Sequence, residues 1–420
     1  MKLSSIRLTM AGSLLLAAIT AACTETLDND AGCPLLCPDQ GGEIQTVTLD
    51  AITLDSTVSA LEGQGTEASL FIATRGDSLD SRAIIRFDSI PALYHKPGPD
   101  TTSIPITQVD SAILRMRIDT VGGKIPATLT LDFYDVNSSA PDTATAVIAA
   151  LFTPDRLITS ATFERASLKD TINVPIPSEQ ILARKGGPMR IGIRARGPES
   201  VQLRLWSQEG AGAPTLLTYR VDPDTTISKI VLVPYSKTPE TQPILANSLA
   251  DYSLIVKGTS TGPATQLNIG GLPARRVYMK FDIPAFIIDS VDVVRATLLL
   301  TQQPNPSIDQ DDTVRIAPQI SLAAATVTDI AKAAQIVAVA RTDTLKVTPG
   351  GSGLRTMEIA NVISLWRSQN PVETPRALIL VSTLEGTSPL EARFFPVESA
   401  PDLRPRLRIS YSARKSTGLP

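Results

Sequence analysis

Few residues in this sequence could do chemistry. It has one histidine, His95, and three cysteines, Cys23, Cys33 and Cys37. Catalysis by an acid, a base or a nucleophile needs such a side chain held against a matching partner. His95 lies in LYHKPGPDTTSIPITQ, a segment typical of an exposed loop, and no second histidine can join it in a metal site. The sequence therefore predicts a chain that is not an enzyme and that uses no cofactor.

Carboxylates are the remaining candidates for catalysis. Two of them held roughly 5 to 10 Å apart suffice for a glycosidase, so an enzyme is kept as the third interpretation. Asp88 and Asp282 each end a strand before a turn, where capping or pairing with an arginine is expected. Asp309, Asp311 and Asp312 form the densest acidic cluster, and such oxygens suit Ca²⁺. Their spacing matches no EF-hand, so we interpret the cluster as a solvated turn and predict no metal site.

The first residues read as an export signal. Lys2 and Arg7 precede an apolar core over residues 8–19, and Thr20-Ala21-Ala22 leads into Cys23. This pattern resembles a bacterial lipoprotein signal and predicts cleavage after residue 22, lipidation of Cys23 and attachment to the outer membrane or cell surface. Plain secretory cleavage near Ala22 is the alternative. The apolar core is shorter than the about 20 residues that a membrane-spanning helix needs.

Residues 23–43 read as a tether rich in Asp, Thr and Gly. Within it, CPLLCPDQ places Cys33 and Cys37 close together, and a local disulfide is expected in an exported chain. A net charge of −3 gives no reason to expect a nucleic-acid partner. The expected partners are the membrane, through the lipid, and either a polysaccharide or another surface protein.

One strand supplies the candidate ligand-binding residues. In residues 201–206, Gln202, Arg204 and Trp206 point away from the apolar face. Trp206 could form a platform on which a sugar stacks, or it could pack against a loop or the neighbouring module. Together with Arg194 and Arg196, Arg204 could bind an anionic polysaccharide. Pairing of these arginines with Asp and Glu across strands is the alternative.

These residues must be positioned by a repeated fold. RAIIRFD at 82–88 and RVYMKFD at 276–282 alternate apolar and polar residues with period two, which predicts half-buried strands. Short helices are expected at 142–150, with Asp142 as N-cap, and at 328–335. Further matched segments are 69–72 with 253–256, 111–116 with 295–300, 174–182 with 357–366, 189–196 with 376–382, and 201–206 with 391–396.

The repeat predicts two tandem domains. At 420 residues the chain suits two domains, which we place at 44–221 and 226–412, with a short tail at 413–420. Many short strands, frequent turn residues and 32 prolines predict an all-β fold of two jelly-roll-like antiparallel β-sandwiches with short helices. Because each copy should own a complete core, we expect each to fold by itself.

The order of the motifs carries a family resemblance. R-x-x-x-x-F-D, S-A-x-L-x-L, a segment ending in V-x-x-W and R-P-x-L-x-I-x-Y are together similar to DNRLRE-type modules, which are extracellular jelly-roll domains of carbohydrate-binding-module type. The first copy departs from the pattern, since it lacks the Trp and has Ala213 where the family has Arg. The second copy matches at Phe281, Asp282, Ala296, Leu298, Trp366, Arg404, Pro405, Leu407 and Tyr411.

The resemblance implies a non-catalytic module on the cell surface. Its motif residues read as core and turn positions, with Trp366 in the core, so they do not identify a ligand. Binding of a glycan or cell-wall polysaccharide is the leading hypothesis. The alternative is a structural or adhesive spacer that packs against other surface proteins, and the low aromatic content of 4% favours it.

Overall fold

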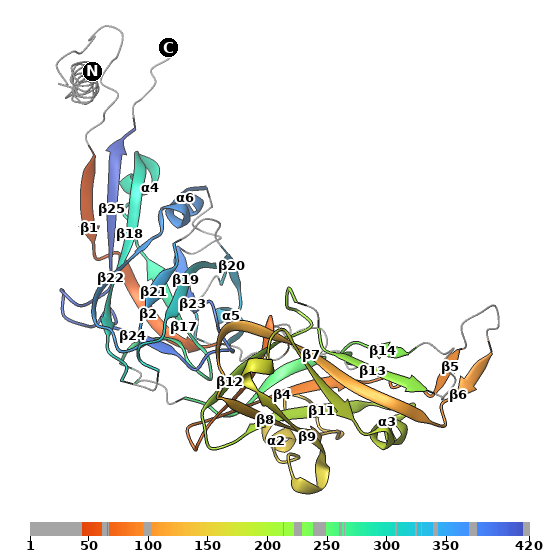
Figure 1. The fold of residues 1–420 in the computed structure, drawn as a ribbon. Coiled ribbons are helices and arrows are strands. Elements are labelled where there is room, and N and C mark those ends of the chain that lie inside the picture. Colours follow the sequence, from red (N-terminus) through yellow and green to blue (C-terminus); the bar gives the residue numbers. More distant parts are fainter. Residues whose placement is uncertain are drawn as a thin grey trace, which may run out of the picture. The chain divides into compact units, whose positions relative to one another are not determined.

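The computed structural model of the chain is all-β. It describes residues 44–60, 65, 67–95, 102–212, 214–221, 229–237, 249–259, 263, 265–306, 309–323, 326–328, 330–338, 343–368 and 376–414. Among these residues, neighbouring strands of the sheets pair antiparallel, and the sheets form two sandwiches (Figure 1), as the sequence predicts. The expected signal peptide, Cys23 and the cysteines Cys33 and Cys37 lie outside the described residues.

The first sandwich is a single sheet that folds onto itself. Its strands run in the order β14-β13-β7-β12-β3-β4-β11-β8-β9, with β10 also on β7 and β15 also on β4. Their bounds are β3 Ser69–Arg75, β4 Leu79–Phe87, β7 Val109–Lys124, β8 Thr128–Asp135, β9 Leu157–Glu164, β10 Thr171–Ile176, β11 Met189–Arg196, β12 Val201–Trp206, β13 Leu216–Val221, β14 Ile230–Leu232 and β15 Asp251–Lys257. A hairpin of β5 (Leu93–His95) and β6 (Ser103–Pro105) and the helices α2 (Thr145–Ala149) and α3 (Ser178–Arg184) complete it.

The second sandwich repeats this arrangement. Its strands run in the order β1-β25-β18-β24-β16-β17-β23-β19-β20, with β2 on β17, β21 on β19 and β22 on β18. Their bounds are β1 Gln45–Leu49, β2 Ile52–Ser59, β16 Leu267–Gly270, β17 Arg275–Phe281, β18 Val291–Gln303, β19 Val314–Ser321, β20 Ile336–Ala338, β21 Leu345–Val347, β22 Gly353–Glu358, β23 Ala377–Ser382, β24 Glu391–Phe394 and β25 Arg406–Ala413. Its helices are α4 (Ala285–Asp289), α5 (Ile330–Ala333) and α6 (Ala360–Ser368).

Long strands connect the two layers of each sandwich. β7 pairs with β13 and β10 through its first part and with β12 through its last part. In the second sandwich, β18 pairs with β25 through its first part, with β22 through its later part and with β24 at its end. Apolar side chains from both layers meet between them and form one large core in each sandwich. Trp366 of α6 is buried in the second core against Phe281, with ring centroids 5.2 Å apart, so its expected core position is confirmed.

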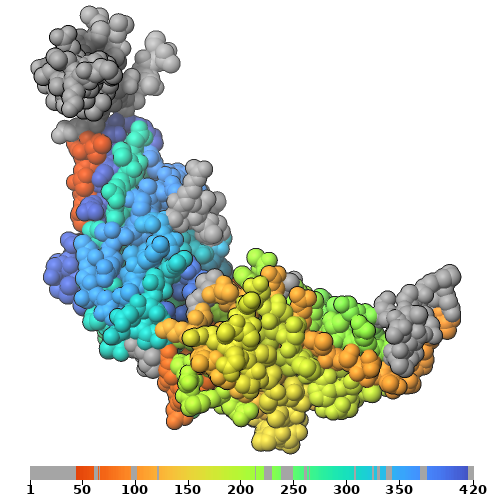
Figure 2. All heavy atoms as spheres, in the orientation of Figure 1, coloured from red at the N-terminus to blue at the C-terminus, as the bar shows by residue number. Residues whose placement is uncertain are grey.

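The strands at the start of each repeat belong to the other sandwich. β1 and β2, which precede the first sandwich in the chain, pair with β25 and β17 of the second. β14 and β15, which precede most of the second sandwich, pair with β13 and β4 of the first. Figure 1 shows β1 beside β25, and in Figure 2 the red atoms of β1 lie among the blue C-terminal atoms. We call these four segments the exchanged strands.

The exchange moves the domain boundaries away from those expected. The first sandwich is formed by residues 69–257, and the second by residues 45–59 together with 267–413. The chain passes from one sandwich to the other between β2 and β3 and again between β15 and β16, rather than between the expected domains 44–221 and 226–412. The proposed match of 69–72 with 253–256 is also wrong. β15 pairs with β4 as β2 pairs with β17, so β15 corresponds to β2. β3 pairs with β4 as β16 pairs with β17, so β3 corresponds to β16. A sequence comparison finds similar strands but does not show which partner each one chooses.

The strand that reads RAIIRFD is buried on both of its faces. All nine residues of β4 are buried, although alternation predicts a half-buried strand. The reason is α2, which covers the face that carries Arg82 and Arg86. The neighbouring strand β15 adds side chains beside Ile84 on the same face. The equivalent strand β17 follows the expectation more closely, because Lys280 is exposed while Val277 and Phe281 are buried.

Candidate functional site

The four residues expected to bind a ligand do not form one cluster. Arg194 and Arg196 lie on β11, whereas Arg204 and Trp206 lie on β12. Two strands, β3 and β4, separate β11 from β12 in the sheet. Each of the four side chains also has its own separate partner in the protein, which we describe in turn. The expected stacking platform flanked by arginines is therefore not assembled in this structure.

Trp206 packs against a loop of its own sandwich. A Cβ placed on Gly212 would lie 2.4 Å from Trp206 Cγ, and one on Gly210 would lie 2.6 Å from its Cε3. Only glycine allows the loop after β12 to approach the indole this closely. Trp206 therefore packs against a loop, which was the alternative stated from the sequence. The face of the ring that the loop covers is not available for stacking on a sugar.

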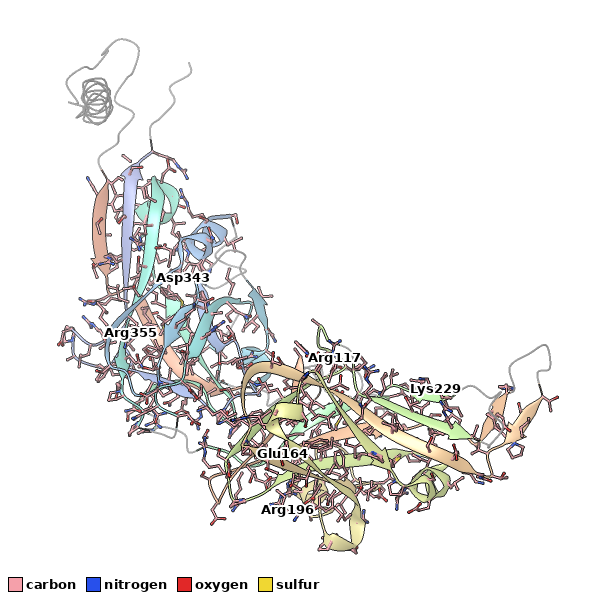
Figure 3. All side chains as sticks on the ribbon, viewed as in Figure 1. Arg117, Glu164, Arg196, Lys229, Asp343 and Arg355 are labelled. Carbon is pink, nitrogen blue, oxygen red and sulfur yellow. The ribbon has the colours of Figure 1, made fainter. Side chains whose placement is uncertain are left out.

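The arginines of β11 are paired with carboxylates. Arg196 Nε lies 2.7 Å from Asp132 Oδ2, and its side chain is 63% exposed (Figure 3). Arg194 Nη2 lies 3.4 Å from Asp80 Oδ2. Pairing across strands was the alternative for these residues, and it is the arrangement found. In each pair the arginine is exposed to solvent although its aspartate is buried, so water screens the interaction.

Arg204 is buried and directed at the other sandwich. It is 2% exposed, and its Nε donates a hydrogen bond to the carbonyl of Thr387, in the segment between β23 and β24, at 2.8 Å. Its guanidinium lies 5.9 Å from the centroid of the Phe71 ring. Burial lowers the pKa of Arg204, while the charge of Asp119 raises it. Arg204 is thus part of the junction between the sandwiches and not of an outer polar face.

The acidic cluster also belongs to this junction. Asp309 forms an ion pair with Arg75, accepts a hydrogen bond from Lys124 Nζ at 2.6 Å and accepts another from Gln202 Nε2 at 3.1 Å. Lys124 also lies 2.6 Å from Asp312. Burial opposes ionisation of Asp309, but hydrogen bonds from Lys124 and Arg75 hold its pKa below the ordinary value. The expected solvated turn is therefore an ion-paired contact, and within the described residues no group of His, Cys, Asp or Glu could hold a metal ion.

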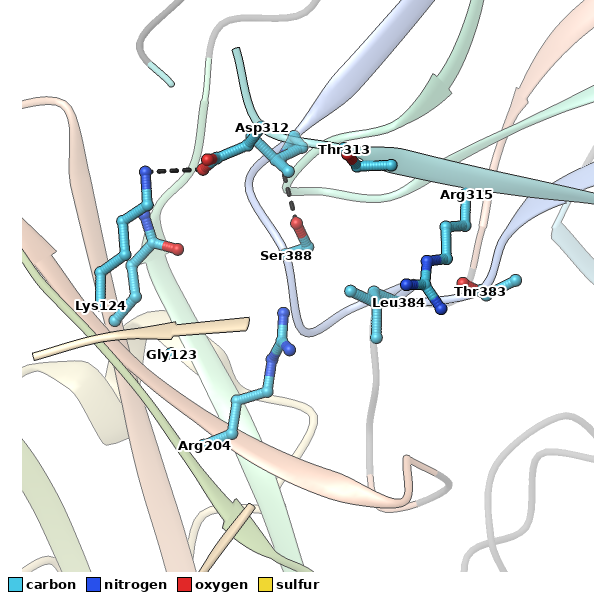
Figure 4. Close-up of a pocket in the computed structure, with 11 residues that line it drawn as sticks. Gly123, Lys124, Arg204, Asp312, Thr313, Arg315, Thr383, Leu384 and Ser388 are labelled. Atoms are coloured by element: carbon cyan, nitrogen blue, oxygen red, sulfur yellow. Dashed lines mark hydrogen bonds and ion pairs between the residues drawn. The ribbon is translucent and has the colours of Figure 1, made fainter. Parts of the chain in front are cut away.

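A pocket lies beside these ion pairs. Its volume is about 380 Å³, and residues from both sandwiches line it (Figure 4). Gln202, Arg204 and the end of β7 come from the first sandwich. The second sandwich contributes the start of β19, with Arg315, and the segment between β23 and β24. The sequence did not indicate this pocket, because its residues are brought together only by the contact between the two sandwiches.

A buried ionic network occupies the charged face of β4. Arg86 pairs with Asp88, with Nη2 and Oδ2 2.6 Å apart, and also with Asp142. Asp142 accepts a hydrogen bond from the Tyr252 hydroxyl at 2.7 Å and lies 3.6 Å from Arg190. Asp142 therefore joins α2 to the sheet, and its expected role as a helix N-cap is wrong, since α2 begins at Thr145 without a side-chain cap. Pairing of Asp88 with an arginine is confirmed.

A second pocket of about 640 Å³ lies in the second sandwich. Asp55 of β2, Gln266, Arg275 and Glu398 are among the residues that line it. Burial raises the pKa of Asp55 to about 6, against the opposing effect of the hydrogen bond from the Val397 backbone N–H. A carboxyl group with a raised pKa can mark a functional site. The first sandwich holds an equivalent carboxyl, Asp251, in a buried position, which favours a structural role for both.

His95 lies on β5 and is exposed, as expected for a loop residue. None of the helices in the described part of the chain has the length and apolar character that crossing a membrane requires.

Comparisons with known proteins give no family. No family model matches this sequence, and no curated protein matches it. Among solved structures, a protein from Parabacteroides distasonis described as secreted is 10% identical, covers 88% of this chain and 99% of its own, and has a TM-score of 0.20. The structure of a Penaeus vannamei nodavirus is 9% identical, covers 91% of this chain and 95% of its own, and has a TM-score of 0.17. Likenesses at these TM-scores carry no conclusion about the function of this chain.

Proposed function

We propose that this chain is an exported, lipid-anchored surface protein with a structural role and no catalytic activity. Its two sandwiches would act as one spacer that packs against other surface components. The observation that carries the proposal is the exchange of strands between the sandwiches. The anchor at Cys23 and the export signal come from the sequence alone.

The exchange joins the sandwiches in a way that suits a spacer. Two chain segments, 60–68 and 258–266, connect them, whereas tandem domains ordinarily share one linker and move freely about it. The ion pairs of Asp309 with Arg75 and Lys124 and the hydrogen bond from Arg204 to Thr387 add contacts between them. Two covalent connections and these contacts together restrict relative motion.

The exchange also determines which sandwich follows the tether. Residue 45 begins β1, which pairs with β25 along its whole length. An anchor at Cys23 would therefore be attached through the tether to the second sandwich. The first sandwich would be carried by the second and presented to the surroundings.

Fractionation of cells tests the proposal. Wild type should incorporate a labelled fatty acid and remain with the membrane, while Cys23→Ser should lose the label. An epitope inserted in the turn at Gly197, between β11 and β12, should be accessible on intact cells. A protected epitope, or a Cys23→Ser variant that still carries the lipid, would contradict it. Hydrolysis of any glycan by the purified chain would overturn the assignment of a non-catalytic role.

A further inference from the structure

Two arginines from different sandwiches line the 380 Å³ pocket at the junction. In Figure 4, Arg204 enters from the first sandwich and Arg315 from the second. Polar residues of the second sandwich, Thr313, Thr383 and Ser388, lie around them, and Leu384 adds an apolar surface. The pocket volume falls within the roughly 300 to 1,000 Å³ that is usual for small-molecule sites.

Arg315 is the exposed cation of this pocket. It lies on β19 next to the buried Val314 and points outward. Within the described part of the chain its side chain makes no ion pair or hydrogen bond. A guanidinium presents a planar fork of N–H groups that fits a carboxylate or a sulfate with two parallel hydrogen bonds. Arg315 can therefore offer this fork to a ligand without losing a protein partner.

The acidic residues Asp309 and Asp312 near the pocket already have cationic partners in the protein. Asp309 is held by Arg75, Lys124 and Gln202, and Asp312 is held by Lys124. Among the residues that line the pocket, Lys124, Arg204 and Arg315 are positively charged and Asp312 is negatively charged. Three cations against one anion leave the lining with two net positive charges, so the pocket favours an anionic ligand. Arg204 is removed from water, which strengthens its attraction for an anion.

We propose that this pocket binds an acidic sugar residue. Its carboxylate or sulfate would pair with Arg315 and Arg204, and its hydroxyl groups would bond to Thr313, Thr383 and Ser388. An inorganic anion would use the arginines but not the hydroxyl groups or Leu384. This proposal does not depend on the structural role proposed above, because it concerns the pocket alone. Since both sandwiches line the pocket, a ligand bound there would also stabilise their contact.

Titration calorimetry on the full chain carrying Cys23→Ser tests the proposal. The probes are glucuronate, galacturonate, glucose and inorganic sulfate, each at low and at moderate salt. At least one acidic sugar should bind, glucose should not, and binding should weaken as salt is added, because exposed charges are screened within about 10 Å at 0.1 M. Arg315→Gln should weaken binding at least tenfold and Arg315→Lys less, since lysine keeps the charge but not the fork.

Arg196→Gln is the matched control, because it removes an exposed strand arginine far from the pocket in the sheet order and should leave binding unchanged. Arg315 is exposed, so its replacement should leave the fold intact, and the melting temperature verifies this. Equal binding of glucose, equal binding of sulfate, or full binding by Arg315→Gln would each overturn the proposal. Absence of binding by both acidic sugars would overturn it as well.

Discussion

Asp55 of β2 and Asp251 of β15 occupy the same register position in the two sandwiches. Asp55 lies opposite Met279 on β17, and Asp251 lies opposite Ile85 on β4. Met279 and Ile85 are the fourth residues of RVYMKFD and RAIIRFD, so the two aspartates are equivalent within the repeat. Two of the exchanged strands, β2 and β15, thus each carry one carboxyl group to the same place in the sandwich that they join.

The surroundings of the two carboxyl groups repeat as well. The backbone N–H of Val397 donates to Asp55 Oδ2 at 2.9 Å, and that of Gln208 donates to Asp251 Oδ2 at 3.1 Å. A glutamate follows in each loop, Glu398 and Glu209, and its charge raises the pKa of the neighbouring aspartate. Burial is the main cause in both cases, and together these effects raise the pKa of Asp251 to about 8.

The free energy of unfolding should fall as the pH rises through the range in which the carboxyl group of Asp251 is protonated in the folded chain but ionised in the unfolded chain. The folded pKa is about 8 and the unfolded value is 3.8, so between these values the native form holds a proton that the unfolded form has lost. The contribution of Asp251 is most favourable below about pH 4 and is lost as the pH approaches 8. Asp251→Asn should flatten the decline, by on the order of a few kcal/mol over this range. Urea unfolding at several pH values measures it.

Asp55→Asn serves as the matched comparison. The folded pKa of Asp55 is about 6, so its replacement should flatten the decline only below that pH. Asp251→Asn should still act between pH 6 and 8, where Asp55→Asn should not. Identical pH profiles for wild type and Asp251→Asn would show that this carboxyl group is not protonated in the folded chain.

The fragments of the chain should fold according to strand pairing and not according to the repeat. Residues 67–258 contain every strand of the first sandwich, including β14 and β15, and should unfold in one cooperative transition. Residues 226–412 lack β1 and β2, which leaves an edge of β17 and of β25 without its partner. This fragment should show no cooperative transition on heating, as followed by circular dichroism.

Complementation provides the control for this experiment. A peptide of residues 44–60 carries both missing strands and should restore a cooperative transition when added to residues 259–414. A cysteine pair at Thr46 and Ser410, whose hydroxyl oxygens are 2.9 Å apart, should form a disulfide within one chain. If residues 226–412 melt cooperatively alone, the exchange of strands is not needed for that sandwich.

The sequence predicts the strands better than their partners. Period-two alternation identifies β4 and β17, and the repeated order of apolar segments identifies most other strands of both sandwiches. It does not show that β2 joins β17, because a strand pattern records which face is apolar and not which edge it pairs with. It also does not show that α2 covers the face of β4 with Arg82 and Arg86 while β15 pairs beside it, since both elements are distant from β4 in the sequence.

The loop that covers Trp206 should tolerate no side chain at Gly212. An added Cβ would lie 2.4 Å from Trp206 Cγ, which forces the indole or the loop to move. Gly212→Ala should therefore destabilise the chain by about 1 to 3 kcal/mol. Gly187→Ala is the control, because its nearest contact would be an ordinary 3.6 Å from the carbonyl of Arg184. Equal denaturant midpoints for the two variants would show that the indole does not pack on this loop.

Removal of Arg86 should be the most damaging of the charge changes discussed. Arg86→Leu leaves Asp88 and Asp142 buried without their main cation and should cost about 3 to 5 kcal/mol. Arg196→Leu also removes an arginine paired with an aspartate, but its side chain is 63% exposed. Its cost should stay below about 1 kcal/mol. Chemical denaturation of both variants measures the loss in the free energy of unfolding. Equal losses would show that pairing with an aspartate determines the loss and that burial of the arginine does not.

The candidate binding residues could be recognised from the sequence only one at a time. Alternation on β12 places Arg204 and Trp206 on one face, and this much is correct. The contacts of each side chain come from other segments of the chain. The loop at Gly212 packs on Trp206, and the carbonyl of Thr387 accepts a hydrogen bond from Arg204. The glycines at 210 and 212, so close after a tryptophan, were the signal that the ring is covered. Arg315 gave no signal, because the pocket exists only where the two sandwiches meet.

The pairing of β1 with β25 has a consequence for how the protein is made. Gln45 and Tyr411, which face each other at the end of this pair, are 366 positions apart. Because a chain is synthesised from its N-terminus, β1 and β2 leave the ribosome long before β17 and β25. The first sandwich can close as soon as β15 has emerged, while β1 and β2 wait with open edges that invite aggregation. The second sandwich is thus the last to be completed, because it needs strands from both ends of the described chain.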